Sequence, residues 1–244
     1  MPIVFITGGA RRIGKGLALR FGRLGWSVGI IYHTSEEAAN AIVNELKSEG
    51  CKCKAVRADV ADNVALEHAL QTLCDELGNP DAIVSNAGIF PPQREVGDLT
   101  LSELRKTLAV NTEPLFTIAS WLKTKGADKG KVHRLISISS LGAFEIWKDR
   151  VDYNMSKSAL VNLVRSLSRS LAPAITVNSV APGAIVIKDE ESGADSNLVS
   201  VNKIPMGRYG TPDDIFDAVL FFATATPYIT GQVLVVDGGY QQMR

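Results

Sequence analysis

The sequence predicts an α/β fold in which one doubly wound parallel sheet carries helices on both of its faces. Two observations predict it. Short apolar runs alternate with helix-length amphipathic segments up to about residue 180, and the runs are β-branched without alternating apolar and polar positions. Unalternating strands are typical of a sheet covered on both faces. A regular strand–helix rhythm indicates right-handed parallel crossovers.

The expected strands are the short β-branched runs, whose composition favours extended backbone. They lie at residues 3–6, 27–32, 54–58, 82–85, 134–138, 175–180 and 233–236. The expected helices are the longer segments between them, in which apolar residues recur with a helical period. They lie at residues 13–24, 36–49, 63–77, 102–123 and 153–171.

Length and charge limit the classes of function. A chain of 244 residues suits a single domain over 1–244, with enough length for a sizeable hydrophobic core. Lys plus Arg equal Asp plus Glu at 26 each, so no basic field is present to bind nucleic acid or an anionic membrane surface. Any bound anion must therefore be held by local geometry.

We expect a cytoplasmic protein without a metal site. Its three cysteines form no C-x-x-C pair, and a sparse, odd count suits a reducing compartment. Residues 2–6 enter a strand without a charged leader, and no apolar run approaches the ~20 residues that span a bilayer. Cys51 and Cys53 are interpreted as packing residues, and His68 and His133 as surface residues without a role.

One long polar stretch interrupts the strand–helix pattern. Residues 188–202 include the run Asp-Glu-Glu-Ser-Gly-Ala-Asp-Ser-Asn. A loop of this length inside a compact domain is usually functional. We therefore expect a lid over the site near residues 188–204.

The first predicted strand leads directly into a glycine-rich segment, and a helix is expected after it. The segment reads Thr7-Gly8-Gly9-Ala10-Arg11-Arg12-Ile13-Gly14. Glycines let backbone amides approach a pyrophosphate, and the helix dipole favours its negative charge. Strand, tight turn and helix N-terminus are the context in which such a turn binds a dinucleotide. The sequence therefore predicts a Rossmann-like fold.

The residues after the second predicted strand indicate which dinucleotide is bound. Residues 32–35 include no acidic side chain that could accept a hydrogen bond from a ribose 2′-hydroxyl. The region instead offers donors suited to a 2′-phosphate, namely Arg11, Arg12, His33, Thr34 and Ser35. NADP(H) is therefore favoured over NAD(H). For His33 alone, a solvated loop histidine is the alternative.

Tyr153 and Lys157 stand four residues apart in a predicted helix. Side chains at this spacing leave the same helix face. An ammonium group beside a phenol favours the phenolate, so we expect Lys157 to lower the pKa of Tyr153 from its ordinary value of about 10. Such a pair could exchange a proton near neutral pH, where general acid–base catalysis works best. Taken alone, a surface lysine beside a half-buried tyrosine is the alternative.

Motifs along nearly the whole chain resemble the short-chain dehydrogenase/reductase family. The turn Thr7-Gly8-x-x-x-Arg12-Ile13-Gly14 is similar to its dinucleotide turn, and Asp237-Gly238-Gly239 to its C-terminal motif. The other matches are Asp59-Val60, Asn86-Ala87-Gly88, Asn111, Ser140 thirteen residues before Tyr153, and Pro182-Gly183 with Ile185.

The resemblance implies cofactor contacts at several of these positions. Asp59 and Val60 would contact the adenine. The segment Asn86-Ala87-Gly88 would close the fourth strand near the cofactor. Pro182, Gly183 and Ile185 would lie beside the nicotinamide amide.

The resemblance also implies a catalytic set and a reaction. Tyr153 would donate a proton to the substrate oxygen, which Ser140 would position. Lys157 would hold the nicotinamide ribose and keep the phenol acidic, and Asn111 would hold a water that relays the proton. The implied reaction is hydride transfer from NADPH to the carbonyl carbon of a small-molecule substrate.

Departures from the family pattern leave the substrate open. Arg12 replaces a usual glycine, and Ile187 replaces a threonine that often follows Pro-Gly. Arg12, Tyr32-His33-x-Ser35 and the segment 171–178 resemble the pteridine-reductase branch, including dihydromonapterin reductases. That branch typically has Asp where this chain has Ser140. A pterin reductase is therefore the first alternative to a carbonyl reductase.

Two further alternatives concern the class of function. The Ser-Tyr-Lys set and Thr34-Ser35-Glu36 resemble the 3-oxoacyl-carrier-protein reductases, but residues 172–174 lack an arginine that often docks the acidic carrier there. A sensor that binds NADP(H) without turnover is the last alternative. The intact catalytic set argues against it.

Apolar residues outside these motifs predict a pocket wall and an interface. Candidates for the wall of an apolar or planar pocket, with core or interface packing as the alternative, are Phe90, Phe144, Ile146, Trp147 and Met206. The helices at 153–171 and 102–123 carry more apolar surface than one sheet face needs, at Leu160, Leu163, Val164, Leu167 and Leu171 and at Leu115, Phe116, Ile118, Ala119 and Leu122. With the resemblance, this predicts a homo-oligomer, a dimer or homotetramer. Purely internal packing is the alternative.

Overall fold

The computed structural model describes residues 1–187 and 199–243 and contains one seven-stranded sheet. The strand order is β3-β2-β1-β4-β5-β6-β7, and every neighbouring pair is parallel. The order reverses between β1 and β4, which is the switch point at which parallel α/β sheets bind ligands. The prediction of a doubly wound Rossmann-like sheet is confirmed.

The strands lie where the apolar runs predict them. Three have the expected bounds: β2 (Ser27–Tyr32), β4 (Ala82–Ser85) and β7 (Val233–Val236). Four differ slightly at an end: β1 (Ile3–Thr7), β3 (Cys53–Arg57), β5 (His133–Ile138) and β6 (Ile175–Pro182). Every residue of β2, β4 and β6 is buried, which explains why these runs do not alternate.

Four helices confirm their predictions: α1 (Arg12–Arg23), α2 (Glu36–Ser48), α3 (Asn63–Leu77) and α6 (Val151–Leu171). The helix α7 (Pro212–Thr224) was not predicted from the sequence. Its start has a clear local signal, because Thr211 and Asp214 form a reciprocal capping box and Pro212 occupies the first turn.

The prediction of one helix over 102–123 is wrong. The structure has α4 (Leu101–Asn111) and α5 (Glu113–Trp121), followed by a π-helical turn at Leu122–Gly126. Pro114 lacks an amide donor and is tolerated only in a first helical turn. The hydroxyl of Thr112, at the break, donates to the Ser156 carbonyl at 2.9 Å. The break therefore ends α4 at Asn111 and docks it on α6.

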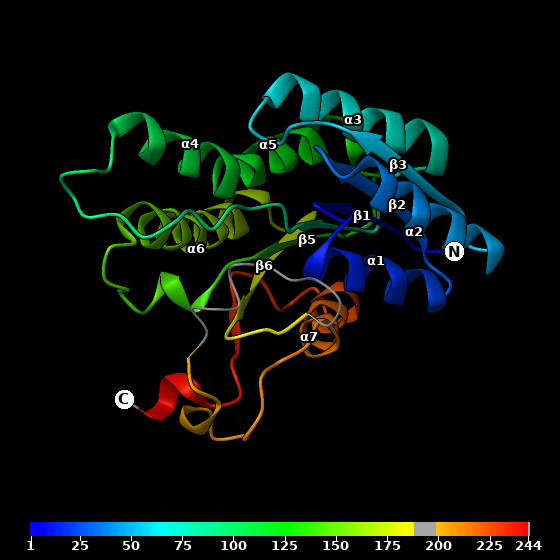
Figure 1. The fold of residues 1–244 in the computed structure, drawn as a ribbon. Coiled ribbons are helices and arrows are strands. Elements are labelled where there is room, and N and C mark those ends of the chain that lie inside the picture. Colours follow the sequence, from blue (N-terminus) through cyan, green and yellow to red (C-terminus); the bar gives the residue numbers. More distant parts are fainter. Residues whose placement is uncertain (188–198, 244) are drawn as a thin grey trace.

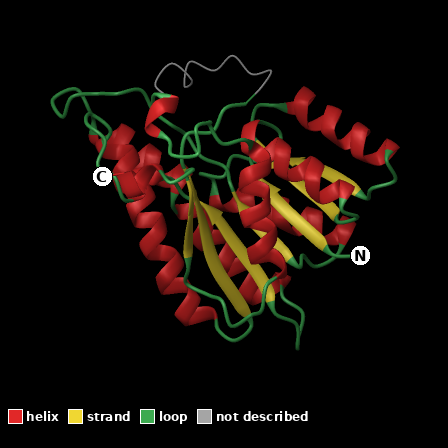
Figure 2. Ribbon diagram, turned by 90° about the horizontal axis from the view of Figure 1, so that it is seen from below, coloured by secondary structure: helices red, strands yellow, loops and turns green. Residues whose placement is uncertain are grey.

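Helices cover both faces of the sheet, as Figures 1 and 2 show. On one face α1 and α7 bury Leu17 and Phe216 together with residues of α2. On the other face α3 and α6 bury Leu70 and Val164 together with residues of α5. Each such buried side chain contributes about 1.5–3 kcal/mol. The two cores therefore hold the strand ends, and the loops that follow them, at fixed positions.

His133 corrects the prediction of a surface histidine. It is fully buried at the start of β5, where Nε2 accepts a hydrogen bond from the Asp128 amide at 2.9 Å and Nδ1 lies 2.6 Å from the Pro80 carbonyl oxygen. The imidazole thus satisfies two backbone groups that would otherwise be buried without partners. His68 is exposed on α3, as expected.

The apolar residues behind the oligomer prediction are largely used inside the chain. On α6, Leu160 and Val164 are buried and Leu163 is partly buried in the same core. The residues named above from 115 to 122 are also buried, except for Phe116, which is 59% exposed. For the buried side chains the internal-packing alternative therefore holds.

Two further predictions concern a lid over the site and membrane-spanning segments. Of the predicted lid at 188–204, residues 188–198 lie outside the described residues, and Val201–Lys203 form a short 3-10 turn before the buried Ile204. Within the described ranges, no helix has the length and apolar character needed to cross a membrane.

Candidate active site

The predicted catalytic residues converge at the carboxyl edge of the sheet. Ser140 follows β5, Tyr153 and Lys157 lie near the start of α6, and Asn111 ends α4. All four side chains are buried. The Lys157 ammonium donates to the Ile138 carbonyl at 3.0 Å and lies 5.9 Å from the centre of the Tyr153 ring.

The amide group of Asn111 is occupied by hydrogen bonds within the protein. Its Nδ2 donates to the Ile89 carbonyl and to the Ser156 hydroxyl, both at 3.0 Å, and its Oδ1 accepts from the Ile89 amide at 2.8 Å. The side chain therefore fixes α4 against α6 and the loop after β4.

The predicted direction of the Tyr153 pKa shift is wrong. Burial raises the pKa of Tyr153, and the Ser140 side chain and the charge of Arg150 only partly oppose this rise. Burial also lowers the pKa of Lys157 to about 8. The physical reason is desolvation, which disfavours both the phenolate and the ammonium. Spacing along the helix predicted the pair correctly but could not reveal its burial.

Lys157→Met should stabilise the folded protein at pH 7. The folded-state pKa of Lys157, about 8, lies below its ordinary value of 10.5. The charged lysine therefore opposes folding by about 3 kcal/mol below pH 8, and this penalty disappears as the pH rises toward 10.5. Loss of the hydrogen bond to Ile138 offsets about 1 kcal/mol, so we expect a net gain of about 2 kcal/mol.

Urea denaturation at pH 7 and pH 10 measures this gain, which should shrink at the higher pH. Lys148→Met, at an exposed position, is the matched control and should have little effect. A Lys157→Met variant that is less stable than the parent at pH 7 would contradict the assignment of a desolvated charge.

Two aromatic side chains wall the Tyr153 ring. The ring centres of Phe90 and Tyr153 are 4.7 Å apart with planes at 84°, and those of Trp147 and Tyr153 are 5.9 Å apart with planes at 9°. Both aromatic residues were predicted for this wall. The other candidates, Phe144, Ile146 and Met206, are exposed.

Arg150 is a site residue that the sequence analysis missed. Its side chain is buried, its guanidinium lies 4.1 Å from the centre of the Phe90 ring, and it donates a hydrogen bond to the Pro91 carbonyl. A cation over a ring face is attracted to the π electrons. Arg150 therefore holds Phe90 against Tyr153. Its contact with Pro91 spans 59 positions of sequence, so no local pattern could signal it.

The turn between β1 and α1 fits a phosphate-bearing ligand. Gly8 has a φ of 63°, and a Cβ on it would lie 2.9 Å from the Ala87 Cα. A Cβ on Gly14 would lie 2.1 Å from the Gly8 carbonyl oxygen. The first turn of α1 contains no acidic residue, and the Arg11 side chain does not cap it. The amides and dipole of this turn therefore favour a pyrophosphate.

Hydrogen bonds join β1 to β4 at the switch point. The Thr7 hydroxyl accepts from the amides of Asn86 and Ala87 at 3.0 Å, and the Asn86 side chain donates to the carbonyls of Thr7 and Gly8. A Cβ on Gly88 would lie 3.6 Å from the Lys157 ammonium nitrogen. The glycine-rich turn therefore adjoins the catalytic set.

The predicted 2′-phosphate donors lie around the end of β2. Arg11, His33 and Thr34 are exposed, and the Ser35 side chain does not cap α2, which it precedes. Arg12 has a φ of 50°. This left-handed conformation is one that glycine adopts without steric cost.

The remaining predicted cofactor residues lie at the same edge of the sheet. The Asp59 carboxylate accepts from the Ala61 amide at 3.0 Å and lies 3.9 Å from His33 Nε2, and Val60 beside it is buried. After β6, the Gly183 amide donates to the Val236 carbonyl at 2.9 Å, and Ile185 forms a bridge with Gly210. Pro182 ends β6, and Ile13 lies in the first turn of α1.

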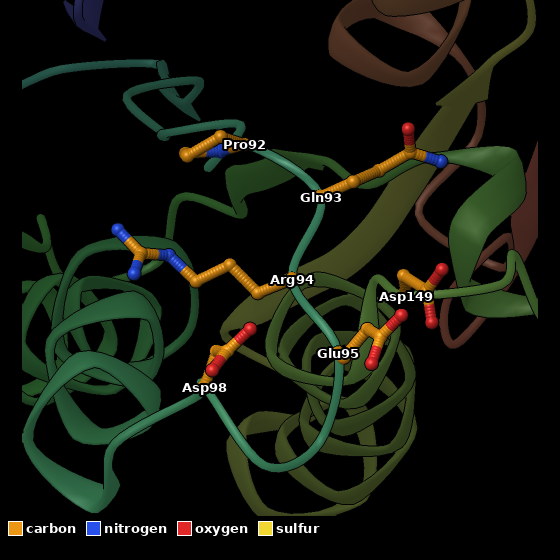
Figure 3. A pocket seen from close by; sticks show the side chains of 6 residues that line it. All are labelled: Pro92, Gln93, Arg94, Glu95, Asp98 and Asp149. Carbon is orange, nitrogen blue, oxygen red and sulfur yellow. The ribbon is translucent and has the colours of Figure 1, made fainter.

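Figure 3 shows a pocket of about 720 Å³. It is lined by Pro92, Gln93, Arg94, Glu95, Asp98 and Asp149. None of these residues belongs to the catalytic or cofactor set. Its lining includes three carboxylates, and Arg94 is already paired with Glu103 at 3.1 Å. The lining of this pocket therefore gives no support for placing the predicted chemistry there.

A dinucleotide turn beside a buried serine, tyrosine and lysine defines a nucleotide-dependent oxidoreductase. Residues 8–241 match the family model described as "Enoyl-(Acyl carrier protein) reductase". The chain belongs to the short-chain dehydrogenase/reductase family, as its motifs predicted.

Similar proteins cover the chain almost completely. The 3-oxoacyl-[acyl-carrier-protein] reductase of Synechocystis sp. is 30% identical over 240 residues, which cover 97% of this chain and 96% of that protein. A blue fluorescent protein from a metagenomic library, solved in complex with NADPH, has a TM-score of 0.88 and 32% identity, covering 98% and 97% of the two chains. A short chain dehydrogenase from Burkholderia cenocepacia, in complex with NADP, has a TM-score of 0.88 and 30% identity over 98% of each chain.

Proposed function

We propose that the protein reduces the carbonyl group of a small organic molecule with NADPH, and that Tyr153 donates the proton. The position of Tyr153 carries the proposal. Its ring is buried between Phe90 and Trp147, and the glycine-rich turn lies close by. The cofactor is NADP(H), which agrees with the donors around β2 and with the NADP complexes of two similar structures.

Each catalytic side chain has a distinct part in this proposal. NADPH, when bound, supplies the hydride. The Ser140 oxygen accepts from the Gly142 amide at 3.1 Å, and its side chain also hydrogen-bonds Tyr153. With a substrate bound between them, the Ser140 hydroxyl would donate to the substrate oxygen. Tyr153 protonates that oxygen as charge develops on it, and the charge of Arg150 favours the resulting phenolate. Lys157 would hold the nicotinamide ribose. The main-chain carbonyl of Asn111, the last residue of α4, would hold a relay water.

The walls of the site favour a planar or apolar carbonyl compound. Phe90 is 41% exposed and Trp147 is partly exposed, so both present aromatic surface next to the Tyr153 ring on which a flat substrate could pack. Ser140 provides a neutral hydroxyl, which suits a carbonyl oxygen. A dihydropterin is also planar, and a 3-oxoacyl thioester is also a carbonyl compound, so both belong in the same assay.

The experiment that tests this function follows NADPH oxidation with three substrates: an aryl ketone, a 3-oxoacyl thioester and a dihydropterin. We expect turnover with the ketone, at a higher kcat/KM than with the other two. Turnover confined to the dihydropterin would indicate that the protein is a pteridine reductase. Tight NADPH binding without turnover of any compound would identify a sensor and overturn the proposal.

Gly142→Ala should impair this reaction by displacing the reactive ring. A Cβ there would lie 2.9 Å from Cε1 of Tyr153 and 3.3 Å from Cζ3 of Trp147. A displacement of ~1 Å at a reacting centre lowers rates by up to about 10²-fold. We expect a similar loss in kcat with little change in NADPH affinity. Steady-state kinetics and fluorescence titration measure the two quantities.

Gly97→Ala is the matched control, because a Cβ there meets nothing within 4 Å. Its kcat should equal that of the parent. An equally active Gly142→Ala variant would show that the position of the Tyr153 ring does not limit the reaction.

We further propose a cytoplasmic homo-oligomer. The exposed Phe116 on α5 and Phe221 on α7 are side chains that a second copy could cover. Cys51, Cys53 and Cys74 are all free thiols, as suits a reducing compartment.

A further inference from the structure

Arg57 lies next to the segment that is expected to contact the 2′-phosphate. It is the last residue of β3, and it pairs with Tyr32 at the end of β2. Its Nε donates to the His33 carbonyl at 3.1 Å. This bond fixes the plane of the guanidinium beside the turn that contains His33 and Thr34. The two terminal nitrogens are left to bind another acceptor.

The side chain of Arg57 lies on the face of the sheet that carries the glycine-rich turn. Residues two apart in a strand share a face of the sheet, so the side chain of Arg57 lies on the same face as that of Ala55. Ala55 packs against Ala10, Tyr32 and Ala39. This small cluster joins the turn before α1, the end of β2 and the first turns of α2. Arg57 therefore stands at the carboxyl end of the cluster, on the edge strand β3 and beside the turn that follows β2.

Among the described residues, the charge of Arg57 is not neutralised by a partner, although acidic residues lie on the neighbouring helix. Across the described ranges no carboxylate forms an ion pair with Arg57. The first turn of α2 carries Glu36 and Glu37. Their charges oppose a phosphate beside Ser35, so an additional cation is needed there. A guanidinium suits this role because its fork of donors matches two phosphate oxygens.

We propose that Arg57 is a further ligand of the cofactor's 2′-phosphate and a determinant of the preference for NADPH over NADH. The inference rests on NADP(H) being the cofactor, and it adds a third arginine to Arg11 and Arg12. Arg57 is 24 positions from His33 and lies in another strand. The sequence after β2, from which the other phosphate donors were predicted, therefore gives no indication of Arg57.

The test measures dissociation constants of NADPH and NADH by fluorescence titration of the full chain, with adenosine 2′,5′-bisphosphate as a competing probe. Arg57→Met should weaken NADPH and the bisphosphate roughly tenfold to thirtyfold, the usual effect of a charge-assisted hydrogen bond, and leave NADH affinity unchanged. Arg57→Lys keeps the charge without the fork and should fall between Arg57→Met and the parent.

Lys54→Met is the matched control. It removes one positive charge from the same strand on the opposite face, where Lys54 pairs with Glu76 at 3.0 Å. Its NADPH affinity should equal that of the parent. An Arg57→Met variant that keeps the parent's preference for NADPH, or loses both cofactors equally, would overturn the role of Arg57 alone. A parent protein that binds NADH as tightly as NADPH would overturn the cofactor assignment itself.

Discussion

Tyr153→Phe should lower kcat by roughly 10²- to 10⁴-fold, the usual contribution of a general acid, and leave NADPH affinity unchanged. The substitution removes one hydroxyl and keeps the ring. Its contacts with Phe90, Trp147 and Gly142 are all made by ring atoms, so the packing persists. Steady-state kinetics with the best substrate gives kcat, and fluorescence titration gives NADPH affinity.

Tyr228→Phe is the control for this substitution, because Tyr228 is 95% exposed and distant in sequence from the site. It should match the parent in both measurements. If Tyr153→Phe kept near-full activity, the proton would come from another group and the assignment of Tyr153 would be wrong.

Substitution of Arg12 should have the second largest effect, which is on the affinity for NADPH. Both Arg12→Ala and Arg12→Gly should weaken NADPH about tenfold to a hundredfold more than NADH, because a charged donor to the 2′-phosphate is lost. The two variants should differ in stability. Arg12 has a φ of 50°, so glycine should be more stable than alanine there by about 1–2 kcal/mol.

Titration with both cofactors and urea denaturation separate these two effects. Arg23→Ala is a suitable control, since that arginine ends α1 and pairs with Glu45 and Glu49, away from the turn. Equal losses of NADPH and NADH affinity in the Arg12 variants would remove the argument that Arg12 recognises the 2′-phosphate.

The sheet could be predicted from sequence because its signal is local. Runs such as 27–32 and 82–85 are buried along their whole length, so they lack the charged residues and the polar alternation of a half-exposed strand. The break at Thr112 also has a local cause, Pro114, and the start of α7 has one in Thr211 and Pro212. Proline and capping residues, and not apolar periodicity, therefore set these two helix boundaries.

The catalytic set could be predicted because the family resemblance fixes its order and spacing. The direction of the Tyr153 pKa shift could not be predicted, because it depends on burial of the ring. Phe90 and Trp147, which contact the ring, come from other segments of the chain. Arg150 and Arg57 were missed for the same reason. Each acts on the site through a partner far away in sequence, Pro91 or His33.

The central claim is that Tyr153 protonates a carbonyl oxygen while the carbonyl carbon is reduced from NADPH. Incubation of the ketone with NADPH deuterated at C4 of the nicotinamide tests it most directly, with mass spectrometry of the alcohol product. We predict that one deuterium appears at the carbinol carbon with the parent protein, and that its rate of appearance falls by about 10²-fold or more with Tyr153→Phe. NADPH consumption without deuterium in the product, or equal transfer rates for the two proteins, would contradict the account.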